Sequence, residues 1–142
     1  MPPIYHHNHT VRADEIDPLG HANNVVYVQW MQDAAVAHST AQGWPMHRYR
    51  DFGHAWVARR HAIEYLVPVS FGDELTIRTW IADMQRVTSL RRFEMYRGET
   101  LIARAETNWA FIRTSDGRLT RVPPEVATAF ELVPDPSGTT GS

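Results

Sequence analysis

The residues best suited to chemistry stand together at positions 17–27, in the run Asp-Pro-Leu-Gly-His-Ala-Asn-Asn-Val-Val-Tyr. The run puts the carboxylate of Asp17 at the end of a predicted strand and at the start of a predicted helix. There it can act as a general base or as a nucleophile, while backbone N–H groups of residues 20–24 stabilise a developing oxyanion. The alternative is that Asp-Pro only starts a turn.

The neighbours of Asp17 admit functional and structural roles. Gly20 supplies a backbone conformation or a close approach that a side chain would block. His21 either orients the substrate or the loop, or packs within the turn. Asn23 and Asn24 are good N-cap residues, and Asn24 is also the second candidate for a catalytic residue. Tyr27, one turn into the helix, either lines a substrate pocket or packs in the core.

Composition excludes several classes of function. The 142 residues carry 14 basic and 16 acidic side chains, a net charge of −2 that gives no bulk attraction to nucleic acid or a membrane surface. Lysine and cysteine are absent, which excludes Schiff bases, thiolate catalysis, disulfides and cysteine-bound zinc. No apolar run approaches the roughly 20 residues of a membrane span, and the first residues do not resemble a signal peptide. We expect a cytoplasmic protein.

One long helix and a series of strands must position the candidate residues. Residues 24–42 contain neither Gly nor Pro and are apolar on nearly all sides, which predicts a buried helix. Runs rich in β-branched and aromatic residues, separated by turn signals, predict strands. The predicted strands are 4–16, 54–67, 74–82, 87–96, 101–113 and 118–122, and a short helix opens at 123–125. This order indicates an α+β fold, in which a curved antiparallel sheet wraps around the helix.

We predict one domain over residues 1–133 and a disordered tail over residues 134–142, which is rich in Pro, Gly, Ser and Thr. The histidines at 6, 7 and 9 raise the question of a metal site. His7 and His9 share a strand face, but no carboxylate or further histidine accompanies them at ligand spacing. We therefore expect no metal.

The run from Asp17 to Tyr27 closely resembles the Asp-x-x-Gly-His-Val-Asn-Asn-x-x-Tyr signature of hot-dog fold acyl-CoA thioesterases, the relatives of 4-hydroxybenzoyl-CoA thioesterase. A second stretch, the Ile-Glu-Tyr-Leu-Val-Pro-Val of residues 63–69 with the Gly-Asp-Glu-Leu of residues 72–75, resembles the family's next strand and its Gly-Asp turn. The resemblance covers residues 4–125 in matching order.

The resemblance implies a hot-dog domain that pairs sheets edge to edge, as a homodimer or a dimer of dimers. It implies a substrate that is a thioester of CoA or of acyl-carrier protein, bound between protomers, and no metal or cofactor. The implied reaction is hydrolysis to free acid and thiol, with Asp17 as the acid. One carboxylate can suffice, because an alkyl thiol has a pKa near 8.5 and its thiolate leaves readily.

The chain departs from the family on the helix. Many relatives carry Trp-Phe-Glu there, whereas this chain has Trp-Met-Gln-Asp at residues 30–33. Asp33 cannot replace that glutamate, because one step along a helix turns the side chain by about 100°. Two other functions stay open. The first is a non-hydrolytic acyl-binding protein, which is consistent with the loss of the helical acid. The second is a hydratase or dehydratase of the same fold, although this chain lacks the Asp-x-Asn-x-x-His pattern that such enzymes often carry.

Three further residues are candidates for substrate binding. Glu64 either positions water or substrate from the partner chain, or is a solvent-facing or arginine-paired carboxylate. Arg59 and Arg91 are candidates for the CoA phosphates, because guanidinium suits phosphate. The alternative for these arginines is a solvated strand face, paired with Glu94 and Glu106.

Overall fold

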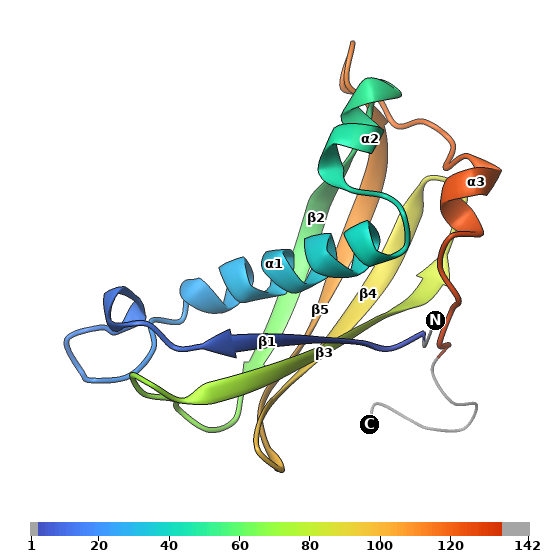
Figure 1. The fold of residues 1–142 in the computed structure, drawn as a ribbon. Coiled ribbons are helices and arrows are strands. Elements are labelled where there is room, and N and C mark those ends of the chain that lie inside the picture. Colours follow the sequence, from blue (N-terminus) through green and yellow to red (C-terminus); the bar gives the residue numbers. More distant parts are fainter. Residues whose placement is uncertain (1–2, 135–142) are drawn as a thin grey trace.

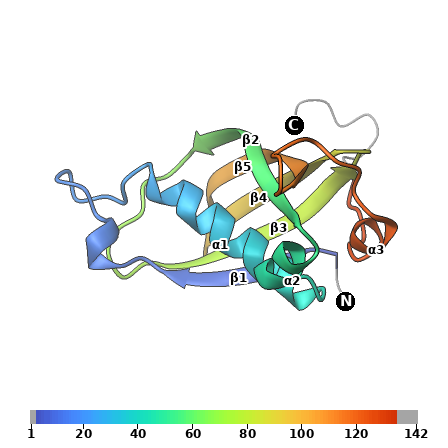
Figure 2. The ribbon, with the colours of Figure 1, turned by 90° about the horizontal axis from the view of Figure 1, so that it is seen from above.

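The computed structural model describes residues 3–134. Within them, five strands form one antiparallel sheet in the order β1-β3-β4-β5-β2, and helix α1 lies across one face of it (Figure 1). The elements are β1 (Tyr5–Thr10), α1 (Val26–Ala41), α2 (Met46–Asp51), β2 (His54–Tyr65), β3 (Glu74–Met84), β4 (Thr88–Arg97), β5 (Thr100–Arg113) and α3 (Pro124–Ala127). The two edge strands, β1 and β2, lie on either side of α1, so that the sheet curves around the helix (Figure 2). This confirms the predicted α+β fold.

The main core lies between α1 and the concave face of the sheet. Trp30, Met31 and Ala34 of α1 are buried in one cluster with inward side chains of β3, β4 and β5, among them Phe93 and Met95. The strands alternate as the sequence predicts: β3 buries its residues 75, 77, 79 and 81 and leaves those between them half-buried. Packing of this face therefore fixes the position of α1, including its N-terminal end, relative to the sheet.

The opposite face of α1 differs from the prediction. Val36 on α1 is exposed, as is Val25 just before its first residue, so the helix is buried on its sheet side and not on nearly all sides. The sequence carries more apolar surface on this helix than the rest of the described chain covers.

Two predicted strands are shorter than expected, and one helix was not predicted. The strand predicted at 4–16 ends at Thr10, and a short 3-10 turn follows at Ala13–Glu15. The strand predicted at 118–122 is reduced to an isolated bridge between Ile112 and Leu119. Helix α2 is too short for a periodic signal; its Tyr49 packs with Trp44 and Phe111 in a second core cluster.

The helix predicted to open at 123–125 is confirmed as α3, with Pro123 at its N-cap and Pro124 at its first position. The predicted tail, apart from Pro134, falls outside the described residues. Across residues 3–134, no helix has both the length and the apolar character needed to cross a membrane.

Candidate active site

Asp17 lies in a closed loop directly before α1. Its N–H donates to the carbonyl of His21 at 2.8 Å, and Ile16 forms an isolated bridge with Ala22. One carboxylate oxygen, Oδ1, accepts the N–H of Leu19 at 2.9 Å and more weakly that of His21 at 3.4 Å. The carboxylate therefore organises the turn, as the Asp-Pro alternative requires, and its Oδ2 accepts no hydrogen bond within residues 3–134.

Gly20 makes the tight turn possible. Its φ is +88°, in the left-handed region that L side chains rarely adopt, and its N–H donates to the Asp17 carbonyl at 3.0 Å. A Cβ built on Gly20 would meet no other atom of the described chain within 4 Å. The glycine is thus needed for its backbone conformation, one of the two reasons the sequence offered.

A buried carboxylate holds the loop against the helix. Glu15 is 3% exposed, and its Oε1 accepts the Arg12 N–H at 2.8 Å while Oε2 accepts the indole N–H of Trp30 at 2.8 Å. His9 Nε2 lies 2.9 Å from Oε1, and the Glu15 carbonyl accepts the Asn23 N–H at 2.8 Å. Burial raises the pKa of Glu15, but the hydrogen bonds from Arg12, His9 and Trp30 outweigh burial and hold it below its ordinary value.

The backbone donors before α1 are not equivalent. Four of the five N–H groups in residues 20–24 are already bonded: Gly20 and His21 to Asp17, Ala22 to the Val69 carbonyl and Asn23 to the Glu15 carbonyl. Within residues 3–134, the N–H of Asn24 has no acceptor. It lies at the N-terminal end of α1, where the helix dipole favours negative charge. Of the donors predicted for an oxyanion, Asn24 N–H is therefore the one available.

The side chains around this donor fall into two groups. His21 and Asn24 are exposed, and no hydrogen bond to either side chain occurs within the described part of the chain. Asn23 accepts the Val25 N–H through Oδ1 at 3.0 Å and so caps the turn before the helix. Tyr27 is 3% exposed and packs against Trp30 and edge-on against Tyr65, the core position that the sequence left as its alternative.

The other candidate residues lie on strands β2 and β4. Glu64 is exposed near the end of β2 and pairs with Arg104 at 2.6 Å. Arg59 is exposed on β2 and has no ion pair within residues 3–134. Arg91, on β4, points into the interior, where its Nη1 contacts His38 Nδ1 at 2.9 Å and Thr79 Oγ1 at 3.0 Å. None of the three has a hydrogen bond or ion pair with Asp17 within residues 3–134, and Glu64 precedes Tyr65, whose hydroxyl donates to the Asn24 carbonyl at 3.1 Å.

The described residues hold no group of three or more His, Cys, Asp or Glu side chains that could bind a metal ion. The carboxylate that meets His9 is Glu15, which the sequence did not associate with the histidines. Their separation along the chain gives no local pattern, because the sheet and the 3-10 turn create the contact.

Comparison with known proteins identifies the family. Residues 11–130 match the model of the thioesterase-like superfamily. Because the match spans most of the chain, the protein belongs to that superfamily. A search of curated proteins returned no match.

Solved structures share the fold. A hypothetical protein from Thermus thermophilus superposes with a TM-score of 0.84 at 24% identity, covering 88% of this chain and 95% of that one. The 1,4-dihydroxy-2-naphthoyl-CoA thioesterase from Synechocystis gives 0.82 at 19% identity, over 89% and 94%. A hypothetical protein from Staphylococcus aureus, solved in complex with CoA, gives 0.84 at 18% identity, over 94% and 90%. The hot-dog fold implied by the resemblance is thereby confirmed.

Proposed function

We propose that this protein is an acyl-CoA thioesterase that hydrolyses a CoA thioester to the free acid and CoA. The observation that carries the proposal is the pairing, on one loop, of the Asp17 carboxylate with the unbonded N–H of Asn24. Membership of the thioesterase-like superfamily supports the reaction class. The relative solved in complex with CoA supports the choice of carrier, and acyl-carrier protein remains the alternative carrier.

In the proposed reaction, Asp17 either takes a proton from the attacking water or attacks the thioester carbon directly to give a mixed anhydride. Its unbonded Oδ2 is the oxygen free to do so, while Oδ1 keeps the loop closed through Leu19. The carbonyl oxygen becomes an oxyanion that accepts the Asn24 N–H at the positive end of α1. Loss of one such donor typically raises the barrier by about 2.7–4 kcal/mol. The C–S bond then breaks and the thiolate leaves. On the nucleophilic route, water then hydrolyses the mixed anhydride, which releases the free acid and restores the Asp17 carboxylate.

The substrate-binding roles of Gly20, His21 and Arg59 belong to the same proposal. Gly20 leaves open space above the loop, because no other atom of the described chain lies within 4 Å of its Cβ position. His21 is exposed beside it and can contact the thioester. Arg59 is exposed and without an ion pair within residues 3–134, so it is the better of the two predicted arginines for a CoA phosphate.

We further propose a homodimer formed through β2. This strand is 12 residues long and has a free edge, which proteins commonly cover by pairing. The exposed apolar residues Val36, Met46 and Val57 lie on α1, α2 and β2 at this side of the molecule. Light scattering of the purified protein should give a mass of twice or four times the chain mass of 16.3 kDa. A monomer at micromolar concentration would contradict this part of the proposal.

The test of the reaction is a thiol-release assay on a panel of benzoyl, short, medium and long acyl-CoAs. A thioesterase releases CoA thiol, which a thiol reagent detects, with a dependence on acyl group. Saturable binding without thiol release would instead support a non-hydrolytic acyl-binding protein, for which Gln32 in place of the helical acid is the favouring observation. Conversion of an enoyl-CoA without thiol release would support a hydratase.

A further inference from the structure

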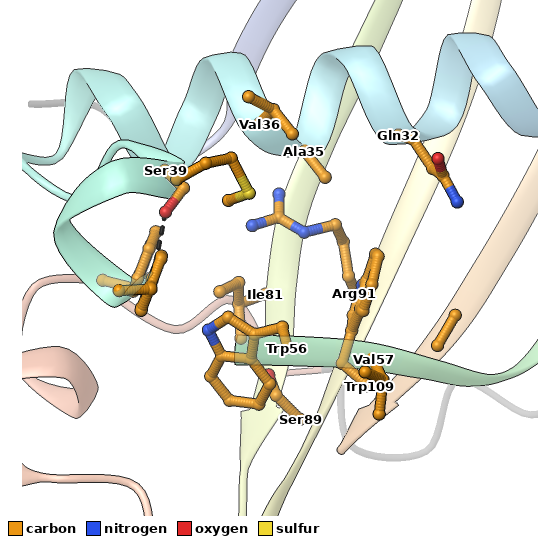
Figure 3. A pocket seen from close by; sticks show the side chains of 14 residues that line it. Gln32, Ala35, Val36, Ser39, Trp56, Val57, Ile81, Ser89, Arg91 and Trp109 are labelled. Carbon is orange, nitrogen blue, oxygen red and sulfur yellow. Dashed lines mark hydrogen bonds between the residues drawn. The ribbon is translucent and has the colours of Figure 1, made fainter. Parts of the chain in front are cut away.

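A cavity of about 350 Å³ lies beside the C-terminal half of α1, away from the Asp17 loop (Figure 3). Its volume is within the range of small-molecule sites. No residue from 17 to 27 lines it, and Ala35, which does, stands roughly 16 Å along the helix from Asn24 at 1.5 Å per residue. Most of the wall is apolar and comes from α1, α2 and the sheet, including Ala35, Val36, Met46, Trp56, Val57 and Trp109.

The wall of the cavity contains one positively charged side chain, that of Arg91. Arg91 is 5% exposed, and Figure 3 shows its guanidinium among the lining side chains, beside Ala35 of α1. Its Nη1 contacts His38 Nδ1 and the hydroxyl of Thr79. Within residues 3–134, its Nε and Nη2 donate to no acceptor, and no carboxylate pairs with it. Three of its five N–H donors are therefore unused.

The contact with His38 does not neutralise Arg91. A guanidinium can only donate, so His38 Nδ1 must be the acceptor and its proton must sit on Nε2. Burial, and secondly the charge of Arg91, lower the pKa of His38 to about 4, so this histidine is neutral at pH 7. Burial lowers the pKa of Arg91 to about 10, which still leaves it charged at neutral pH. A buried charge without a counter-ion is costly.

A second donor in the same wall is unsatisfied. The indole N–H of Trp109 is buried and has no hydrogen-bond partner within residues 3–134. Trp109 also lines the cavity. Buried polar groups in folded proteins are usually hydrogen-bonded. The Trp109 nitrogen has almost no accessible surface, so the unpaired guanidinium of Arg91 in the cavity wall is the group that indicates a ligand supplying acceptors.

We propose that this cavity binds the carboxylate end of an apolar organic acid, with Arg91 as the anion-binding residue. Nε–H and Nη2–H of a guanidinium form the fork that a carboxylate matches with two parallel hydrogen bonds. The apolar wall holds the hydrocarbon. A phosphate group fits less well, because Arg91 is the one charged side chain among the lining residues and cannot balance a doubly charged group.

The same chemistry has two possible sources. The carboxylate belongs either to a free organic acid, or to the far end of an acyl group whose thioester is held at Asp17. The second source rests on the proposed function, and the first does not.

The first experiment measures ligand affinity by isothermal titration calorimetry on the full-length protein at neutral pH. Its two probes, octanoate and octanol, have the same chain length and differ in the carboxylate. Octanoate should bind more tightly than octanol to the wild-type protein. Arg91→Met should weaken octanoate binding about ten- to a hundredfold, the usual effect of losing a charge-assisted hydrogen bond, and leave octanol unchanged.

The matched control is Arg78→Met. Arg78 lies on the neighbouring strand and pairs with Glu94 at 2.9 Å, away from the cavity wall, so octanoate binding should not change. Equal binding of octanoate by the wild type and Arg91→Met, or no preference of the wild type for octanoate over octanol, would overturn the proposal. The comparison of octanoate with octanol on the wild-type protein needs no variant, so it tests the proposal even if Arg91→Met does not fold.

The second experiment separates the sources. Dicarboxylyl-CoA thioesters from hexanedioyl to dodecanedioyl are compared with their methyl-ended counterparts. A preference in kcat/KM for the carboxyl-ended series that Arg91→Met abolishes assigns the site to the acyl end. Octanoate binding without that preference assigns it to a free acid. Failure of every thioester to react would count against the proposed function alone, because the calorimetric result stands apart from it.

Discussion

Lowering the pH below neutrality should remove a specific contribution of His38 to folding stability. In the folded protein His38 is 2% exposed, stacked on Tyr5, and accepts a hydrogen bond from Arg91 at 2.9 Å. Its folded pKa is about 4, against 6.5 for an ordinary histidine, so between these values the unfolded chain binds the proton and the folded chain does not. The stabilisation is complete above pH 6.5 and is lost as the pH falls toward 4.

The size of the effect follows from the shift. One pKa unit corresponds to about 1.4 kcal/mol, so a shift from 6.5 to about 4 gives a loss of about 3 kcal/mol over this pH window. That is a large part of the roughly 5–15 kcal/mol of a small domain. The main cause is burial, which penalises the charged imidazolium, and the neighbouring charge of Arg91 adds to it.

The assay is urea unfolding followed by tryptophan fluorescence, at a series of pH values from about 7 to about 4.5. The comparison protein is His38→Asn, whose side-chain oxygen can accept from Arg91 and does not titrate. His7 and His61, whose pKa values burial also lowers, titrate in both proteins and cancel in the difference. The free energy of unfolding of the wild type should fall about 2–3 kcal/mol more than that of His38→Asn. Parallel curves for the two proteins would refute the reasoning.

Three further predictions concern the loop and the second core. Glu15→Gln should lower the free energy of unfolding, measured in urea, by about 1–3 kcal/mol, because it weakens the charge-assisted hydrogen bonds from Arg12, His9 and Trp30. No change would show that these hydrogen bonds do not stabilise the fold. Gly20→Ala should cost about 1–2 kcal/mol through backbone strain alone, since its Cβ meets no atom, and Gly20→Asn should cost less in the same assay. Tyr49→Phe should cost about 1 kcal/mol by removing the 3.0 Å contact with Ser39, and a larger loss in thermal unfolding would indicate a packing defect.

Much of the fold could be predicted because long elements carry strong periodic signals. The helix predicted at 24–42 is observed at Val26–Ala41, and the four long strands after it are close to their predicted bounds. Prediction failed where a side chain competes with the sheet for the backbone. The first strand stops at Thr10 because the N–H of Arg12 bonds to the Glu15 carboxylate. The strand predicted at 118–122 and helix α2 depend on tertiary packing, which short segments do not encode locally.

The candidate site was predictable where its residues are adjacent in the chain. Asp17, Gly20 and Asn24 form one local loop, so the sequence indicated their region and the helix-start donors. It did not indicate which donor is free, because the partners of Ala22 and Asn23 are Val69 and Glu15, from other parts of the fold. The cavity around Arg91 was missed for the same reason: residues from four strands and two helices line it.

The most direct test of the central claim is the rate of acyl-CoA hydrolysis by Asp17→Asn, measured by thiol release on the best substrate of the panel. The asparagine oxygen can still accept the Leu19 N–H that Asp17 accepts at 2.9 Å, so the loop and the urea midpoint should be retained. We predict that kcat/KM falls by about a hundredfold to ten-thousandfold, the usual share of a general base. The matched control is Asp33→Asn on α1, which alters the 2.8 Å contact with Gln29 and removes a charge near His7, and its activity should equal that of the wild type. Near-wild-type activity in a folded Asp17→Asn protein would contradict the account.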